Sequence, residues 1–159
     1  MTKRIFFVVG HENYGKSYTL RSLLDMCERR GWRVIIRETE IMIRRMSNDD
    51  QPKPFIKFMK RTSRTVIIAA LCPKFERLGN SEDNPDKYVD ETLRSLKKRG
   101  YDFHFWVLQH QWGEPYSVTP SEIGELKRNG HVEVLNGRNI EAKTRAKRLR
   151  AYISKQLSA

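Results

Sequence analysis

Short apolar runs alternate along this chain with stretches in which apolar residues recur every three or four positions. The runs are rich in β-branched and aromatic residues, which is typical of buried strands, whereas the longer repeats are typical of helices. The runs predict strands at Ile5–Val9, Arg33–Arg37, Thr65–Leu71, Tyr101–Leu108 and His131–Leu135. The repeats predict helices at Lys16–Arg30, Lys53–Lys60, Pro85–Arg99, Pro120–Arg128 and Asn139–Leu157.

Strands that are flanked throughout by helices indicate a parallel sheet that is covered on both faces. At 159 residues the chain has the length of one domain. The sequence therefore predicts a single α/β domain over residues 1–159. Its expected architecture is a three-layer α/β/α sandwich around a five-stranded parallel sheet.

The loop after the first predicted strand reads GHENYGKS, from Gly10 to Ser17. This is the G-x-x-x-x-G-K-[ST] pattern, in which the glycines let backbone N–H groups surround phosphate oxygens. Lys16 reaches the β- and γ-phosphates, and the Ser17 hydroxyl can bind Mg²⁺. The following helix adds the positive end of its dipole to the same site. We therefore expect a P-loop NTPase fold, with ATP and Mg²⁺ as cofactors and Ser17 as the metal ligand. The predicted nucleotide-binding residues are Gly10, His11, Glu12, Asn13, Tyr14, Gly15, Lys16, Ser17 and Tyr18.

The positions of the acidic residues separate the classes of P-loop protein. ATP-driven motors and GTPases usually have an acid at the end of a later strand, and neither AALCPKF nor FWVLQHQW supplies one. The guanine-reading N-K-x-D and the D-x-x-G of GTPases are also absent. Glu38 and Glu40 instead follow the second predicted strand, at the edge that faces the γ-phosphate in this fold. A carboxylate there can deprotonate an acceptor hydroxyl or hold the Mg²⁺ shell. The predicted catalytic residues are thus Lys16 with Glu40 and, as second choice, Glu38; alternatively, either acid is an exposed residue at a strand end.

In its glycine-rich loop, its acid after the second strand and its order of elements, the chain resembles the small P-loop kinases. These include adenylyl-sulfate kinase, gluconate kinase, polynucleotide 5′-kinase and the nucleoside monophosphate kinases. AALCPKFERL is similar to the third strand of adenylyl-sulfate and gluconate kinases, and it lacks the Asp-Arg or Glu-Arg pair of nucleoside monophosphate kinases. In size and charge the chain is also similar to bacteriophage kinases that phosphorylate hydroxymethyluracil in DNA. The resemblance implies transfer of the γ-phosphoryl group of Mg-ATP to a hydroxyl.

The charge of the chain bears on the acceptor. There are 31 Lys and Arg against 19 Asp and Glu, a formal net charge of +12. A nucleotide pocket needs few cations, so the excess favours a larger polyanion, most simply DNA; the alternative is a solvated basic surface. The segment between the second and third predicted strands combines cations with Phe55 and Phe58, which suits phosphates and bases. The predicted acceptor-binding residues are Arg44, Arg45, Lys57, Arg61 and Arg128, and Arg44 is also expected to neutralise charge during transfer.

The predicted function is an Mg-ATP-dependent kinase that acts on a hydroxyl of a nucleic acid or nucleotide, in its sharpest form a hydroxymethylated pyrimidine base in DNA. Two alternatives stay open: a nucleic-acid-binding P-loop ATPase or switch without an acceptor, and a small-metabolite kinase. No apolar stretch reaches the roughly 18 residues of a membrane span, and MTKRIFFVVG does not match a signal peptide. We therefore expect no membrane partner and a cytoplasmic location, in the host cytoplasm if the protein is viral. ATP versus GTP and the oligomeric state stay open.

Overall fold

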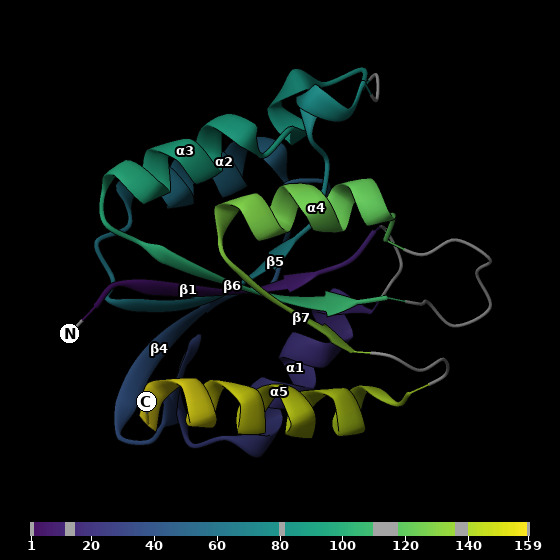
Figure 1. Cartoon of the computed structure of the whole chain (residues 1–159). Helices are drawn as coiled ribbons and strands as arrows, with labels where there is room; N and C mark the ends of the chain where they lie inside the picture. Colours follow the sequence, from purple (N-terminus) through teal and green to yellow (C-terminus); the bar gives the residue numbers. More distant parts are fainter. Residues whose placement is uncertain (1, 12–14, 80–81, 110–117, 136–139, 159) are drawn as a thin grey trace.

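The described strands form one mixed sheet in the computed structural model of the chain (Figure 1). The structure describes residues 2–11, 15–79, 82–109, 118–135 and 140–158. The strands are β1 (Arg4–Val9), β2 (Arg29–Arg30), β3 (Arg33–Ile36), β4 (Thr39–Arg44), β5 (Val66–Leu71), β6 (Asp102–Leu108) and β7 (His131–Leu135). The α-helices are α1 (Lys16–Met26), α2 (Pro52–Arg61), α3 (Asp90–Lys98), α4 (Pro120–Asn129) and α5 (Ala142–Ser158). Two 3-10 turns, η1 (Glu76–Leu78) and η2 (Pro85–Lys87), lie between β5 and α3.

The strand order is β2-β3-β4-β5-β1-β6-β7. The five strands from β4 to β7 in this order pair in parallel, whereas β2, β3 and β4 pair antiparallel. The α/β class is confirmed, but the prediction of a purely parallel five-stranded sheet is wrong. An antiparallel extension of two strands makes it a seven-stranded mixed sheet.

The second predicted strand is the source of this difference. Its residues form β3, which turns back at Arg37 and Glu38 into β4, the strand that pairs with β5. Both turn residues have positive φ angles, 49° and 64°, which is the geometry of a tight hairpin turn. Such turns favour Asn and Gly, so Arg37-Glu38 carries no hairpin signal, and the prediction for this segment contains the strand Arg33–Arg37 without a return strand.

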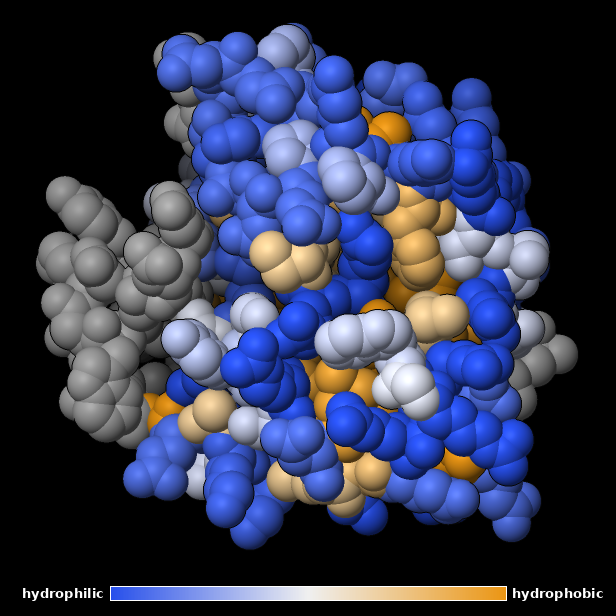
Figure 2. Space-filling view, turned by 180° about the vertical axis from the view of Figure 1, so that it is seen from behind, coloured by the Kyte–Doolittle hydropathy of each residue, from blue (hydrophilic) through white to orange (hydrophobic). Residues whose placement is uncertain are grey.

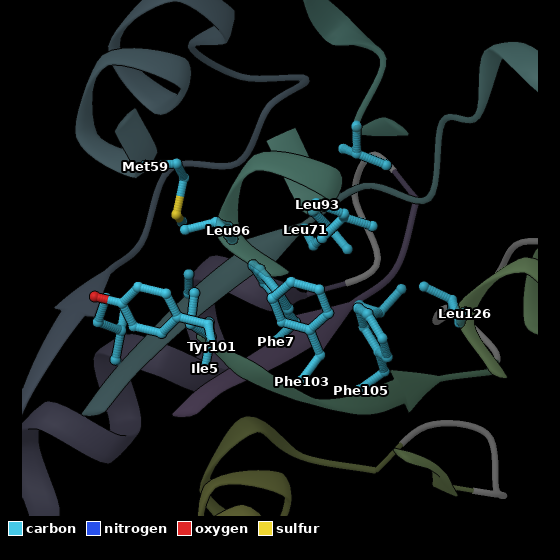
Figure 3. Packing of buried hydrophobic residues seen from close by; sticks show 14 of the residues in the cluster. Ile5, Phe7, Met59, Leu71, Leu93, Leu96, Tyr101, Phe103, Phe105 and Leu126 are labelled. Carbon is cyan, nitrogen blue, oxygen red and sulfur yellow. The ribbon is translucent and has the colours of Figure 1, made fainter. Parts of the chain in front are cut away.

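Helices cover both faces of the sheet (Figure 1). On one face, α2, α3 and α4 enclose a core that contains Phe7, Phe103 and Phe105, packed with Met59, Leu93, Leu96 and Leu126 from the helices (Figure 3). On the other face, α1 and α5 pack side by side and bury Leu20, Leu23, Leu149 and Ile153 against Phe6 and Val8 of β1. The expected layers of helix, sheet and helix are therefore present.

Three predicted helices are shorter than expected, of which the last, predicted from residue 139, begins at Ala142. The first ends at Met26, because Cys27 is already extended with φ −101° and ψ 155°. The predicted helix from residue 85 begins as η2, capped by the Asn84 side chain, and α3 itself begins at Asp90. None of the helices in the described part of the chain is both long and apolar enough to cross a membrane.

The sheet has a topological switch point at the carboxyl ends of β1 and β5. These two strands are neighbours, yet the chain leaves β1 into α1 on one face and leaves β5 toward α3 on the other. Ligands of open α/β sheets bind where neighbouring strands diverge in this way. This switch point, called the crevice below, lies next to Cys72 and next to Gly10, the first residue of the loop of residues 10–17, which is called the glycine-rich loop below.

Candidate functional site

The glycine-rich loop leads directly into the N-terminus of α1. Gly15 is the cap residue, in the left-handed conformation with φ 84° and ψ 16°, and no acidic residue stands in the first turn. The first N–H groups of a helix have no partner within it and attract anions. The predicted binding residues Glu12, Asn13 and Tyr14 lie outside the described residues. Tyr18 is 68% exposed beside the loop.

The Lys16 side chain binds the backbone at the start of the glycine-rich loop. Its side chain is buried, and its Nζ donates to the carbonyl of Gly10 at 2.6 Å and to that of His11 at 2.8 Å. The Gly10 N–H donates to the Leu71 carbonyl at 3.1 Å, so the loop is anchored to β5. The predicted lysine therefore stands at the first position of α1, with its ammonium against the loop backbone.

A second cation, Arg145 of α5, packs against the loop. A Cβ atom on Gly15 would lie 2.7 Å from Arg145 Nη2. Arg145 is held there because its Nε donates to Thr19 Oγ1 at 2.8 Å and its Nη1 donates to the Ile140 carbonyl. Burial lowers the pKa of this guanidinium. Sequence reasoning missed it, since α5 carries many cations and nothing in the sequence distinguishes this one.

His11 connects the loop to β5 and α4. Its Nε2 lies 2.8 Å from Glu122 Oε1, and its Nδ1 lies 3.8 Å from Cys72 Sγ. Glu122 is 3% exposed and forms a capping box with Thr119, whose N–H it accepts at 2.8 Å. The carboxylate of a helix cap therefore also positions a loop residue, a role that the capping pattern in the sequence does not reveal.

An ionised carboxylate lies beyond the carboxyl end of β4, at Asp49. Lys74 Nζ lies 2.8 Å and Lys87 Nζ lies 3.3 Å from Asp49 Oδ1. Burial alone would raise the pKa of Asp49, but the hydrogen bonds and charges of the two lysines outweigh it and lower that pKa. Lys74 also pairs with Glu82 at 2.6 Å, and these carboxylates raise the pKa of Lys74 against the effect of burial. The group is called the Asp49 cluster below.

Cys72 stands between the loop and the Asp49 cluster. Burial raises the pKa of its thiol to about 12, and the charges of Lys16, Asp49, Lys74 and Glu122 all act on it. The loop lysine, the Asp49 cluster and the buried Glu122 thus converge on the end of β5. As the sequence indicates, β5 itself ends without an acidic residue, and the carboxylates near its end come from other segments.

Glu38 and Glu40 lie at the other end of the sheet, which corrects the expectation that they face the loop. Glu38 is exposed in the β3–β4 turn, and Glu40 pairs with Ile35 at the amino end of β4. From the register, Glu40 is level with Thr65, six residues before Leu71, or about 20 Å along the strand. Glu40 instead pairs with Arg33 at 2.7 Å.

The predicted acceptor-binding cations separate into three places. Arg44, Lys57 and Arg61 line one hollow between β4 and α2. Arg45 stacks over the exposed ring of Trp32, with 4.9 Å from the guanidinium carbon to the ring centroid. Arg128 pairs with Glu125 of its own helix at 3.5 Å. The first three are therefore brought together, whereas Arg45 and Arg128 are not among them.

The chain was compared with family models, with curated proteins and with solved structures, and it matches none of them.

Proposed function

We propose that this chain is a P-loop phosphotransferase, which binds a Mg²⁺-nucleoside triphosphate on the glycine-rich loop and transfers its γ-phosphoryl group to a hydroxyl in the crevice. The observation that carries the proposal is the position of Lys16. Its buried ammonium donates to the Gly10 and His11 carbonyls at the start of the loop. A lysine in this place can exchange those carbonyls for phosphate oxygens.

The residues present fit a triphosphate. Gly15 combines a positive φ with a position so close to Arg145 that a side chain there would have to displace the guanidinium. The N–H groups of the first turn of α1 and the two cations, Lys16 and Arg145, would surround the phosphates. Ser17 would be the protein ligand of Mg²⁺, an ion that keeps waters and phosphate oxygens as its other ligands. When bound, the triphosphate supplies the phosphoryl group and Mg²⁺ neutralises its charge.

Asp49 takes the place of Glu40 as the acid that we propose for the acceptor side. It follows the parallel strand next to β5, and its lysine partners keep it ionised. A carboxylate of lowered pKa is a weak base, so its role would be to accept a hydrogen bond from the acceptor hydroxyl and orient it. Lys74, 2.8 Å from Asp49, would neutralise negative charge on the acceptor side.

A transfer assay with γ-³²P-labelled ATP or GTP, Mg²⁺ and a panel of acceptors tests this function. The panel contains plain DNA, DNA with hydroxymethylated pyrimidines, RNA, 5′-hydroxyl oligonucleotides, nucleoside monophosphates and adenylyl sulfate. We expect label on one acceptor, a loss of at least a hundredfold with Lys16→Ala, and unchanged transfer with Lys147→Ala, a matched change on the exposed face of α5. Asp49→Asn should lower kcat more than it changes KM for the triphosphate.

Release of label only as free phosphate would overturn the kinase and favour the nucleotide-driven switch that lacks an acceptor. Full activity of Lys16→Ala would overturn the loop as the nucleotide site. Label on adenylyl sulfate alone would assign the chain to the small-metabolite kinases, and label on modified DNA to the kinases of DNA modification.

A further inference from the structure

A basic hollow of about 480 Å³ lies between α2 and the face of β4 that points toward that helix. Arg44 enters it from the strand, Lys57 and Arg61 from the helix, and Arg64 from the segment before β5. We call these four residues and Phe58 the α2–β4 trough. In Figure 1, α2 lies behind α3, and Figure 2 shows the molecule from behind, where strongly hydrophilic side chains surround small apolar patches.

The charges of the trough are all positive and largely without partners. Lys57, Arg61 and Arg64 are exposed and form no ion pair within the part of the chain that the structure describes. Arg44 Nε is buried without a hydrogen-bond partner among the described residues, and burial lowers the pKa of Arg44. Cations that line one hollow repel one another, and an anion that binds between them reduces the repulsion.

The trough also offers an aromatic surface and little competing negative charge. The Arg44 guanidinium lies over the Phe58 ring at 5.5 Å, and such a pair suits bases as well as phosphates. The carbonyls at the end of α2 would repel a phosphate, but Arg99 donates to two of them, those of Met59 and Thr62. The lining therefore presents cations, hydroxyls of Thr62 and Ser63, and one ring.

The cations of the trough come from three segments, β4, α2 and the chain before β5, which suits several phosphates better than a single one. Arg44 is level with Ala69 of β5, and Arg64 precedes the first residue of that strand by two positions. Arg44 and Arg64 therefore enter the trough at different levels along the strand direction. Cations at different levels can each contact a different phosphate of a nucleic-acid strand. The Phe58 ring beside these cations favours a single strand, whose unpaired bases can stack, over a duplex.

We infer that the α2–β4 trough binds the backbone of a single-stranded nucleic acid and leads it toward the crevice. The binding itself is independent of the glycine-rich loop; only the assignment of the bound strand as phosphoryl acceptor rests on the proposed function. Arg44 lies at the end of the trough that is nearer to the carboxyl edge of the sheet, where Asp49 follows β4.

The test is fluorescence anisotropy of a labelled twelve-nucleotide oligothymidylate at several salt concentrations. The variant Lys57→Ala/Arg61→Ala/Arg64→Ala changes exposed residues and leaves the half-buried Arg44 in place. Its matched control, Lys143→Ala/Lys147→Ala/Arg150→Ala, removes the same charge from the exposed face of α5. Circular dichroism and urea unfolding confirm that both variants are folded.

We expect the trough variant to raise Kd at least tenfold and to lower the salt slope by about 2, since each phosphate contact on a single strand contributes about 0.7. The control should change Kd less than threefold. Equal weakening by both variants would mean a diffuse basic surface and would overturn the inference. So would the absence of oligonucleotide binding, tighter binding of a duplex, or equal competition by poly-glutamate.

Lys16→Ala separates this inference from the proposed function. That variant should bind the oligonucleotide as the wild type does while losing phosphoryl transfer. Binding through the trough in a protein that transfers no phosphoryl group would leave the trough established and the kinase overturned. If the trough variant still transfers phosphoryl groups at saturating nucleic acid but has a raised KM for the acceptor, the result supports both the phosphotransferase and the nucleic-acid site in the trough.

Discussion

The side chain of Asn48 pairs with the backbone of Cys72 through both of its polar atoms. Its Oδ1 accepts the Cys72 N–H at 2.8 Å, and its Nδ2 donates to the Cys72 carbonyl at 3.0 Å. Nδ2 also donates to the Lys87 carbonyl at 2.6 Å, and the residue is 0% exposed. One amide therefore joins the segment after β4 to the end of β5 and holds the neighbouring Asp49 beside its lysines.

Asn48→Ala should lower the free energy of unfolding by about 3 kcal/mol, because it removes three hydrogen bonds and leaves buried backbone groups without partners. Urea unfolding at neutral pH measures the change. Asn129→Ala is the matched control, since that amide makes one bond, to the Glu125 carbonyl within α4, and should lose about 1 kcal/mol. Equal losses in the two variants would show that Asn48 does not join the strands.

Gly15→Ala should destabilise the protein by about 3 kcal/mol, from the left-handed backbone and from the contact with Arg145. The guanidinium cannot simply move aside, because Thr19 and Ile140 hold it. In an Arg145→Ala background, the same change should lower the free energy of unfolding by only about 1 kcal/mol, which is the part that comes from the backbone. Urea unfolding of the four proteins gives the coupling, and a coupling near zero would exclude the contact.

Much of the fold could be predicted because it depends on local patterns. The buried strand at residues 4–9, the loop motif and the helix that follows are adjacent in the chain, so spacing alone locates them. The hairpin of β3 and β4 could not be predicted, since its Arg37-Glu38 turn uses residues that rarely adopt positive φ.

Because the prediction lacked the hairpin, it placed the candidate catalytic acid at the opposite end of the sheet. With a single strand that ends at Arg37, Glu38 and Glu40 follow its carboxyl end. In the hairpin, Glu40 lies at the amino end of β4, and Asp49 follows the carboxyl end of that strand. The contacts of His11 with Glu122 and of Gly15 with Arg145 join residues more than 100 positions apart. Such pairs depend on the packing of helices on the sheet, and no local pattern in one sequence encodes them.

Glu40→Gln should leave nucleotide binding and phosphoryl transfer at wild-type levels, because the carboxylate is about 20 Å from the loop by the strand register. It loses one exposed ion pair with Arg33, which is worth less than about 1 kcal/mol of stability. Filter binding with labelled ATP, together with the transfer assay, measures both properties. A large loss of kcat in this variant, with normal stability, would restore Glu40 as a catalytic acid.

The Cys72 thiol should be inert to thiol reagents in the folded protein at pH 7 to 8. Burial raises its pKa to about 12 and excludes reagents, so neither thiolate nor access is available. Cys27→Ser leaves Cys72 as the single cysteine, and titration with a chromogenic disulfide should then detect one thiol in urea and almost none without it. Rapid reaction of the folded variant would mean that the end of β5 opens readily.

His104 should make the protein less stable in mild acid. It is 6% exposed in β6, and its ring stacks on Phe6 at 4.7 Å and on His131 at 5.1 Å. Burial is the main cause that lowers its pKa to about 4, and the charges of His131 and Arg4 add to it while Asp102 opposes it. The unfolded chain, with an ordinary pKa near 6.5, therefore takes up a proton at a higher pH than the folded one.

The sign of the effect follows from this difference. Above pH 6.5 both states hold a neutral imidazole and stability is unaffected. As the pH falls from about 6.5 to about 4, only the unfolded state gains the proton, so stability decreases over this range. The loss between pH 7 and pH 5 should be about 2 kcal/mol.

Urea unfolding of the wild type and His104→Phe at these two pH values measures this contribution. The substitution keeps a ring between Phe6 and His131 and removes the titrating group, so the difference between pH 7 and pH 5 should shrink by about the same 2 kcal/mol. Carboxylates that do not interact with His104 contribute equally to both proteins and cancel in the comparison. The same pH dependence in both would place the titrating group elsewhere and would mean that His104 is protonated in the folded protein.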